Sequence, residues 1–205
     1  FCFVCLLLPL IALAQPETAV LRQPLDSLSK AALQLAGQRS FDQALEINTS
    51  ALRLARDSGG LQSALYGDAC LDRGVIFLQK GDYQQAETHF LESEKVYIAA
   101  LGPEHRLSVL AEANLSDVYL RMGDFEKSEY YHLLVKDIRE KTLGKNHKDY
   151  ISALGNLANL YTEMGEFERA DPLYIENLHL REQLNGKDHR DYATALNNWG
   201  LNFLK

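Results

Sequence analysis

Residues 154–174 read Leu-Gly-Asn-Leu-Ala-Asn-Leu-Tyr-Thr-Glu-Met-Gly-Glu-Phe-Glu-Arg-Ala-Asp-Pro-Leu-Tyr, and this stretch decides the fold. Apolar residues recur every three or four positions on both sides of Gly165, at Leu154, Leu157, Ala158, Tyr161, Ala170, Leu173 and Tyr174. This spacing places apolar side chains on one side of an α-helix, whereas a strand would alternate them at every second residue. The stretch therefore predicts two amphipathic helices joined by a turn at Gly165.

The same pattern returns every 42 residues along the chain. It aligns Gly81, Gly123 and Gly165; Gly60, Gly102, Gly144 and Gly186; Phe77, Tyr119, Tyr161 and Phe203; and His105, His147 and His189. One pair of helices cannot cover its own apolar stripe, so neighbouring pairs must stack. The sequence thus predicts an all-α fold, a right-handed α-solenoid of antiparallel helix pairs.

The repeat also predicts how the chain is divided. After a segment 1–14 and a linker 15–24 we expect a divergent repeat 25–66, repeats 67–108, 109–150 and 151–192, and the first helix of an incomplete fifth repeat at 193–205. Arg39 stands where later units have a turn glycine, so the first unit is expected to be an irregular cap.

Glycines and polar residues mark the ends of the predicted helices. A glycine after the first helix suits a left-handed conformation, and the next residue can cap the second helix. Asp82 with Gln85, and Ser40 with Gln43, have capping-box spacing, whereas Asp124 and Glu166 bring negative charge to the helix start. We expect Gly102, Gly144 and Gly186 to end the second helix in the same way.

Two stretches carry a family resemblance, residues 154–174 and the segment Leu180-Arg-Glu-Gln-Leu-Asn-Gly-Lys-Asp-His-Arg-Asp-Tyr-Ala-Thr-Ala-Leu-Asn-Asn-Trp-Gly200. They resemble 42-residue tetratricopeptide repeats of the kinesin light chain type, well over residues 67–205 and weakly over 25–66. Arg106, Lys148 and Arg190 depart from the family, which usually has proline after the histidine. The resemblance implies a scaffold for protein partners. It also extends to bacterial exported proteins that carry such repeats ahead of a caspase-like CHAT peptidase domain.

The first fourteen residues are uncharged and apolar, which is too short a run to cross a bilayer. They are typical of a secretory signal with cleavage after Ala14, and we expect the start of that signal to be missing because the chain opens on Phe1. Cleavage would remove Cys2 and Cys5 and leave Cys70 as a core thiol. We therefore expect an exported, periplasmic or secreted protein of bacterial origin. The alternative is a buried N-terminal helix.

Composition and motifs exclude several functions. With 21 basic and 28 acidic side chains, a net charge of −7 argues against a protein that follows nucleic-acid phosphates. The sequence contains no phosphate-binding loop, nucleophile elbow, His-Glu-x-x-His or Cys-x-x-Cys motif, so we expect no catalysis and no cofactor. Histidines one repeat apart cannot share a metal ion, because helix axes lie about 8–10 Å apart and a ligand must come within about 2.1 Å of Zn²⁺. His105, His147 and His189 are expected to close the loop before the next repeat.

A helical projection places another set of side chains in the concave groove, the predicted site for a protein or peptide ligand. We expect no nucleic-acid partner and no membrane insertion of the mature chain. The predicted groove residues are Asn114, Asp117, Arg121, Asn156, Asn159, Glu163, Asn197 and Asn198, with Asp68, Leu71 and Gln79 in the second unit.

One asparagine column has two open interpretations. Asn114, Asn156 and Asn198 repeat every 42 residues. Each amide offers an acceptor and two donors, so the column could bind the main chain of an extended peptide. Alternatively, it could tie adjacent repeats to each other.

Two further expectations concern irregular positions. Arg73 and Glu112 interrupt apolar columns in consecutive repeats, and we hypothesise that they form a partly buried ion pair. Trp199 and Phe203 belong to a helix whose partner helix is missing, so part of their apolar surface is expected to be open to self-association.

These observations favour a non-catalytic scaffold that binds a peptide or protein in the groove of the solenoid. The alternative is the sensory region of a larger enzyme, a CHAT-type peptidase with its catalytic domain beyond Lys205. A third, weaker option places a membrane-spanning signalling kinase there.

Overall fold

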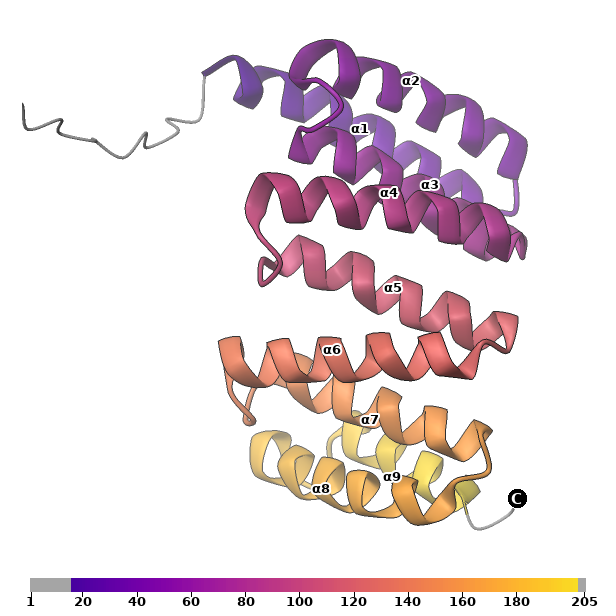
Figure 1. Cartoon of the computed structure of the whole chain (residues 1–205), viewed down its shortest axis with the longest axis vertical. Helices are drawn as coiled ribbons and strands as arrows, with labels where there is room; N and C mark the ends of the chain where they lie inside the picture. The colour runs from indigo at the N-terminus through magenta and orange to yellow at the C-terminus, as the bar shows by residue number, and fades with distance from the viewer. Residues whose placement is uncertain (1–15, 203–205) are drawn as a thin grey trace, which may run out of the picture.

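The computed structural model describes the backbone of residues 16–202 and the side chains of residues 22–200. Over that range the chain is all-α, as the sequence predicts (Figure 1). Its helices are α1 Pro16–Gly37, α2 Phe41–Gly59, α3 Ala64–Lys80, α4 Tyr83–Leu101, α5 Arg106–Met122, α6 Phe125–Leu143, α7 Lys148–Glu163, α8 Phe167–Asn185 and α9 Arg190–Asn202. Each helix packs against the next in a right-handed α-solenoid.

The helices form two layers. In Figure 1 the second helices of the pairs, α2, α4, α6 and α8, lie in front, and the first helices lie behind them. The stretch 154–174 builds a core between α7 and α8, in which Leu157, Ala158, Tyr161, Ala170 and Tyr174 are at most 4% exposed. Apolar residues at helical spacing therefore face each other across each pair, which confirms the predicted periodicity.

The turn inside each pair uses a glycine with a left-handed backbone. Gly81, Gly123 and Gly165 have φ values of 85°, 76° and 76°. At the first of these turns the Gly81 amide donates to Leu78 O, and the Asp82 amide donates to Phe77 O at 2.9 Å. This pattern satisfies carbonyls that the end of a helix leaves free, and it confirms the predicted turn.

The turn between pairs differs from this, so our expectation that both glycine columns act alike is wrong. Gly102, Gly144 and Gly186 also have positive φ, between 80° and 95°, but their ψ values are 159°, 163° and 166°. The chain extends away from the helix here instead of curling back over it. Side chains are almost excluded from this region of backbone space, so its requirement for glycine is stricter than that of the left-handed turn.

Caps at the second helices follow the prediction in part. The carboxylates of Asp82 and Asp124 accept hydrogen bonds from the amides of Gln85 and Lys127, each at 3.2 Å. Ser40 and Glu166 make no side-chain cap bond. The Glu166 carboxylate instead pairs with Arg169, which lies one turn into the same helix.

The histidines cap the first helices. Nδ1 of His105, His147 and His189 accepts a hydrogen bond from the amide two residues ahead, at 3.2, 3.1 and 3.2 Å. In the same column Ser63 caps α3 by accepting from the Tyr66 amide. The histidines therefore close the loop, as expected. Arg106, Lys148 and Arg190 are the first residues of their helices, a position that also favours proline.

The first repeat starts earlier than predicted, but its turn is regular: the amides of Arg39 and Ser40 donate to Ala36 O and Leu35 O, both at 2.9 Å, as at the glycine turns. Helix α1 begins at Pro16, so the segment predicted as a linker is helical from that residue, and Pro24 lies inside the helix. Helices α3, α5 and α7 each start three residues before the repeat boundary that we assigned. The expected signal segment 1–14, with Cys2 and Cys5, and Phe203 lie outside the described residues. None of the helices in the described range has an apolar stretch long enough to span a bilayer.

Replacing Arg39 by glycine is expected to stabilise the protein by about 0.5–1 kcal/mol. Arg39 has a φ of 62°, a left-handed conformation that costs a residue with a side chain about 1–2 kcal/mol and costs glycine little. Chemical denaturation would measure the gain. The variant Arg39→Ala removes the charge but keeps the strain, so an equal gain from alanine would contradict this explanation.

Candidate functional site

The predicted groove residues all lie on the first helices of the pairs, chiefly on α5, α7 and α9. Each first helix from α1 to α7 packs one side against the second helix of its pair. We call the surface formed by the opposite sides of the first helices the inner face. Asn156, Glu163 and Asn197 are exposed there, and Arg121 is exposed but pairs with half-buried Asp117 at 2.9 Å. Asn114, Asn159 and Asn198 are half-buried. Asn159 also contacts the second helix of its pair, because the Tyr174 hydroxyl on α8 donates to Asn159 Oδ1 at 2.7 Å. The placement of the other groups on the inner face stays a prediction from helical projection.

The asparagine column does not have a single role. Asn114 Nδ2 donates to the carbonyl of Leu110 in its own helix at 2.8 Å. Asn198 Nδ2 donates to Asn159 Oδ1 of the preceding repeat at 3.4 Å, an inter-repeat contact. Asn156 is exposed and has the amide most accessible to a ligand. Neither of the two interpretations holds for the whole column.

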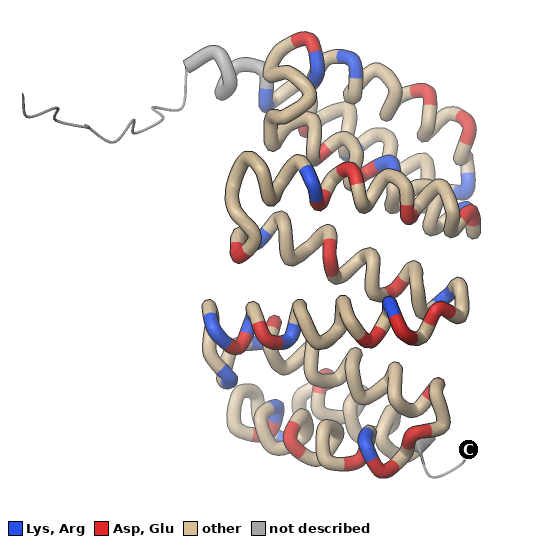
Figure 2. Tube along the Cα trace, in the orientation of Figure 1, with Lys and Arg blue, Asp and Glu red and all other residues tan. Residues whose placement is uncertain are grey.

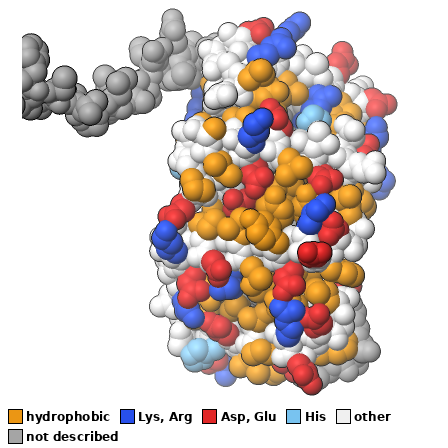
Figure 3. Space-filling model, in the orientation of Figure 1, with side chains coloured by type: hydrophobic (Ala, Val, Ile, Leu, Met, Phe, Trp, Pro, Cys, Tyr) orange, Lys and Arg blue, Asp and Glu red, His pale blue; other side chains and the backbone are white. Residues whose placement is uncertain are grey.

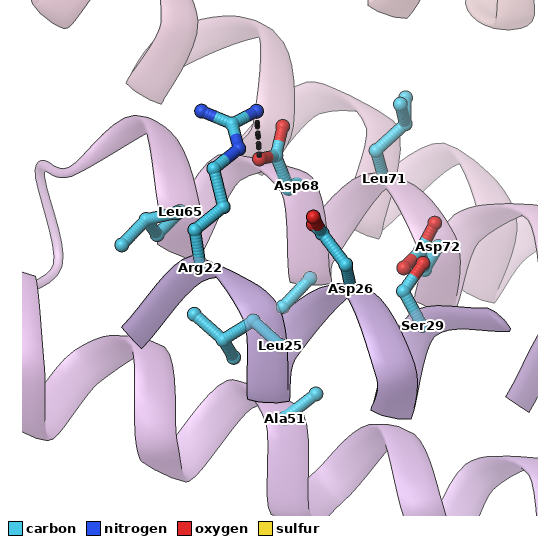
Figure 4. Close-up of a pocket in the computed structure, with 10 residues that line it drawn as sticks. Arg22, Leu25, Asp26, Ser29, Ala51, Leu65, Asp68, Leu71 and Asp72 are labelled. Atoms are coloured by element: carbon cyan, nitrogen blue, oxygen red, sulfur yellow. Dashed lines mark ion pairs between the residues drawn. The ribbon is translucent and has the colours of Figure 1, made fainter. Parts of the chain in front are cut away.

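A pocket opens where α1 meets α3, and the sequence did not reveal it. Its cavity of about 210 Å³ is larger than an engineered cavity of about 150 Å³ that binds benzene. Figure 4 shows residues from both helices converging on it. Two of the predicted groove residues, Asp68 and Leu71, line the pocket. Its other lining residues are Arg22, Leu25, Asp26, Ser29, Ala51, Leu65, Ala69 and Asp72.

The pocket is negatively charged. Three carboxylates, those of Asp26, Asp68 and Asp72, line it together with one guanidinium. Arg22 Nη2 lies 3.9 Å from Asp68 Oδ2, and the Tyr97 hydroxyl donates to the other Asp68 oxygen at 2.6 Å. Burial, with added repulsion from Asp68 and Asp26, raises the pKa of Asp72 to about 6. A bound cation would relieve this repulsion.

The walls of the pocket suit a long cationic side chain. Leu25, Leu65 and Leu71 provide apolar surface beside the carboxylates. Lysine and arginine bury their methylene stems against such surface and present the charge at the tip. The arrangement can therefore hold a lysine or arginine side chain. A signal for part of this site is present in the sequence, because Asp26 and Asp68 lie one repeat apart.

A second feature that the sequence did not reveal ties neighbouring repeats together. The Tyr161 hydroxyl donates to Glu129 Oε1 at 2.9 Å, and the Arg169 guanidinium lies 3.8 Å from the centre of the Tyr161 ring. One repeat earlier Tyr119 donates to Glu87 at 2.7 Å, with the Lys127 ammonium 4.8 Å from the ring centre. These aromatic residues therefore join repeats and are not free for a ligand.

The hypothesised ion pair between Arg73 and Glu112 is wrong. Arg73 Nη1 instead reaches back to α2, where it donates to Asn48 Oδ1 at 3.3 Å and Thr49 Oγ1 at 3.0 Å. Glu112 is 2% exposed, and its Oε2 has no hydrogen-bond partner.

The structure also describes two other residues for which the sequence led to an expectation, Cys70 and Trp199. Cys70 is 1% exposed, and burial raises the pKa of its thiol to about 11, in agreement with a core thiol. Trp199 is half-buried, and its Nε1 donates to Asp171 Oδ1 at 3.2 Å. In the same helix Leu196 is 46% exposed, so self-association through α9 stays a prediction.

The face formed by the second helices is different in character. Figure 2 shows acidic and basic residues interspersed along these helices, and Figure 3 shows hydrophobic side chains gathered near the middle of the face. Leu91, Ile98, Tyr130 and Ile175 are between 37% and 62% exposed on α4, α6 and α8. Within the described range, no group of three or more His, Cys, Asp or Glu side chains is placed to hold a metal ion.

The stacked pairs, the glycine turns and the polar inner face define a helical-repeat scaffold. The chain belongs to the tetratricopeptide repeat family, whose model matches residues 67–141, 106–176 and 149–205. Kinesin light chain-like repeats are also found among the solved structures that it resembles, so the resemblance seen in the sequence is confirmed. The further resemblance to CHAT-domain proteins has no support from these comparisons.

Three solved structures illustrate the likeness. BtubC (BKLC) from P. vanneervenii is 18% identical with a TM-score of 0.82, over 91% of this chain and 74% of that one. A putative kinesin light chain with nearly identical TPR-like repeats from Podosopora anserina is 15% identical with a TM-score of 0.78, over 88% and 86%. A substituted form of the Podosopora anserina protein gives 15% identity and a TM-score of 0.79, over 88% and 85%. No curated protein sequence matches the chain. At these identities the likeness shows the fold alone.

Proposed function

We propose that the protein is a non-catalytic scaffold that binds an extended segment of a partner protein along its inner face, with a lysine or arginine of that segment in the acidic pocket. The tetratricopeptide repeat fold supports a protein-interaction scaffold in general. The pocket between α1 and α3 carries the finer proposal, because three carboxylates line it together with three leucine side chains.

The rest of the inner face suits main-chain contacts. Helical projection places Asn156 of α7 and Asn197 of α9 on it, and both amides are exposed. Amide side chains pair with a peptide backbone regardless of its sequence, each bond adding about 0.5–1.5 kcal/mol. In this proposal the pocket selects the charge and the amides hold the backbone. Affinity then depends on several contacts acting together.

Selection from a random twelve-residue peptide library on the immobilised full chain tests the proposal. Enriched peptides should carry a lysine or arginine at a fixed position, and norleucine in its place should weaken binding at least about tenfold. Asp26→Asn and Asp72→Asn should have a similar effect, whereas Asp188→Asn, at an exposed position near α9, should have none. Enriched peptides without a basic residue, or unchanged affinity in Asp72→Asn, would contradict the charge-selective site.

Replacing Asn156 by alanine is expected to weaken the selected peptide while leaving the free energy of unfolding within about 0.5 kcal/mol, because its side chain is exposed. Replacing Asn198 should cost stability as well, because its amide contacts Asn159 of the preceding repeat. Isothermal titration and chemical denaturation of both variants would measure the two quantities. A loss of stability without a loss of binding in Asn156→Ala would favour a structural role for this column.

A further inference from the structure

Glu112 is a carboxyl group in a position built for an apolar residue. It lies on α5, which packs against α4 and α6, and the same position in other repeats is occupied by Cys70, Leu154 and Leu196. The side chain is 2% exposed, and Oε2 lacks any donor. A buried carboxylate without a donor is strongly disfavoured, whereas a protonated carboxyl is tolerated much better.

The surroundings of Glu112 add negative charge. Glu94 on α4 repels the Glu112 carboxylate; burial raises the pKa of Glu94 as well, and Tyr131 on α6 offsets part of that rise. Tyr131 stays protonated, because burial raises its pKa further above the usual value. Among the described ion pairs, none joins Glu112 to a basic side chain. Burial, followed by repulsion from Glu94, raises the pKa of Glu112 to about 7.

Because the raised pKa belongs to the folded state, folding takes up a proton. The ordinary glutamate value is 4.5, so between about pH 4.5 and 7 the folded chain holds a proton that the unfolded chain has released. The stabilising contribution is complete below that range and is lost as the pH rises through 7. Above pH 7 the folded state must hold an unpaired buried charge or rearrange.

We propose that Glu112 and Glu94 form a proton-binding site that tightens the α4–α5–α6 junction when occupied and loosens it when empty. Asn114 and Asp117 lie on the same helix as Glu112 and belong to the inner face, so proton release would act on the middle of that face. This proton-binding site is a property of the folded chain and does not depend on the identity of a partner.

Urea denaturation of the full chain between pH 5 and pH 9 tests this proposal in wild type, Glu112→Leu and Glu112→Gln. Leucine is the residue of the Leu154 position, and glutamine mimics the protonated carboxyl. Relative to either variant, the unfolding equilibrium of the wild type should shift toward the unfolded state by about a hundredfold between pH 5 and pH 8. Asp72, His89 and His132 also have shifted pKa values but are present in every protein, so they cancel in this difference. Parallel pH profiles in wild type and Glu112→Leu would overturn the proposal.

Glu126→Gln is the control, because it removes an exposed carboxylate from the adjacent helix α6 and should keep the wild-type profile. Amide hydrogen exchange, corrected for its intrinsic pH dependence, gives a second measurement. From pH 6 to pH 8 the amides of α5 should lose protection in the wild type and keep it in Glu112→Gln. Equal protection at both pH values in the wild type would overturn the proposal even if a variant folds poorly.

Discussion

Replacing Gly74 by alanine is expected to destabilise the protein by about 2 kcal/mol, although alanine is the better helix former by about 1 kcal/mol. Gly74 is buried in α3, and a Cβ atom there would come within 2.5 Å of two carbons of the Phe90 ring. Phe90 is fully buried, so its ring cannot move without disturbing the core. Overpacking of this kind costs about 1–3 kcal/mol or more. Chemical denaturation at a pH below 6 would measure the loss without interference from Glu112.

Two further substitutions, at Gly200 and at Phe90, separate the cost of overpacking from the difference in helix propensity. Gly200 belongs to the same 42-residue column, but a Cβ atom there would meet nothing within 4 Å, so Gly200→Ala should stabilise slightly. Combining Gly74→Ala with Phe90→Leu should cost less than the sum of the two single changes, because the smaller side chain makes room for the methyl group. Additive losses would show that the two residues are not in close contact.

Replacing Gly144 by alanine is expected to cost about 3 kcal/mol, and replacing Gly123 about 1 kcal/mol. Both glycines have positive φ, at 81° and 76°, but Gly144 has a ψ of 163°, whereas Gly123 has a ψ of 12°. Only glycine readily adopts the first of these combinations, and asparagine tolerates the second. Thermal and urea unfolding of Gly144→Ala, Gly123→Ala and Gly123→Asn would give the ranking.

Neither Cβ atom would meet a neighbour, so the comparison isolates the backbone. Equal losses at Gly123 and Gly144 would contradict the assignment of two different turns. A smaller loss in Gly123→Asn than in Gly123→Ala would support the left-handed conformation at the turn inside each pair.

The fold was predictable because its signals repeat. Gly165 and the apolar residues around it recur in other units, so errors at single positions do not change the outcome. The conformation of the second glycine column was not predictable, because a glycine indicates positive φ but carries no information about ψ. The start of α1 was missed because a proline normally interrupts a helix, whereas the structure places Pro24 inside one.

The site was less predictable than the fold. A helical projection gives the direction of a side chain but not its partner, so Asn114, Asn156 and Asn198 were grouped although their contacts differ. The pocket was missed because it combines two repeats, one of which diverges from the pattern; only the spacing of Asp26 and Asp68 indicated it.

Glu112 illustrates the same limit. The break in its column correctly marked an unusual position, but repeat register does not reveal which neighbouring helix a charge will face. Arg73 turned out to contact α2, and the group that faces Glu112 is a second carboxyl.

Site-specific photo-cross-linking tests most directly whether the inner face is the working surface. A photoreactive amino acid would be placed at Asn156 or Asn197 on the inner face, and at Tyr130 or Ile175 on the face of the second helices, each in the full chain with the library-selected peptide. If the inner face is the working surface, Asn156 and Asn197 should give cross-links that the unlabelled peptide competes away, and the other two positions should give none. Cross-links from Tyr130 and Ile175 alone would contradict it.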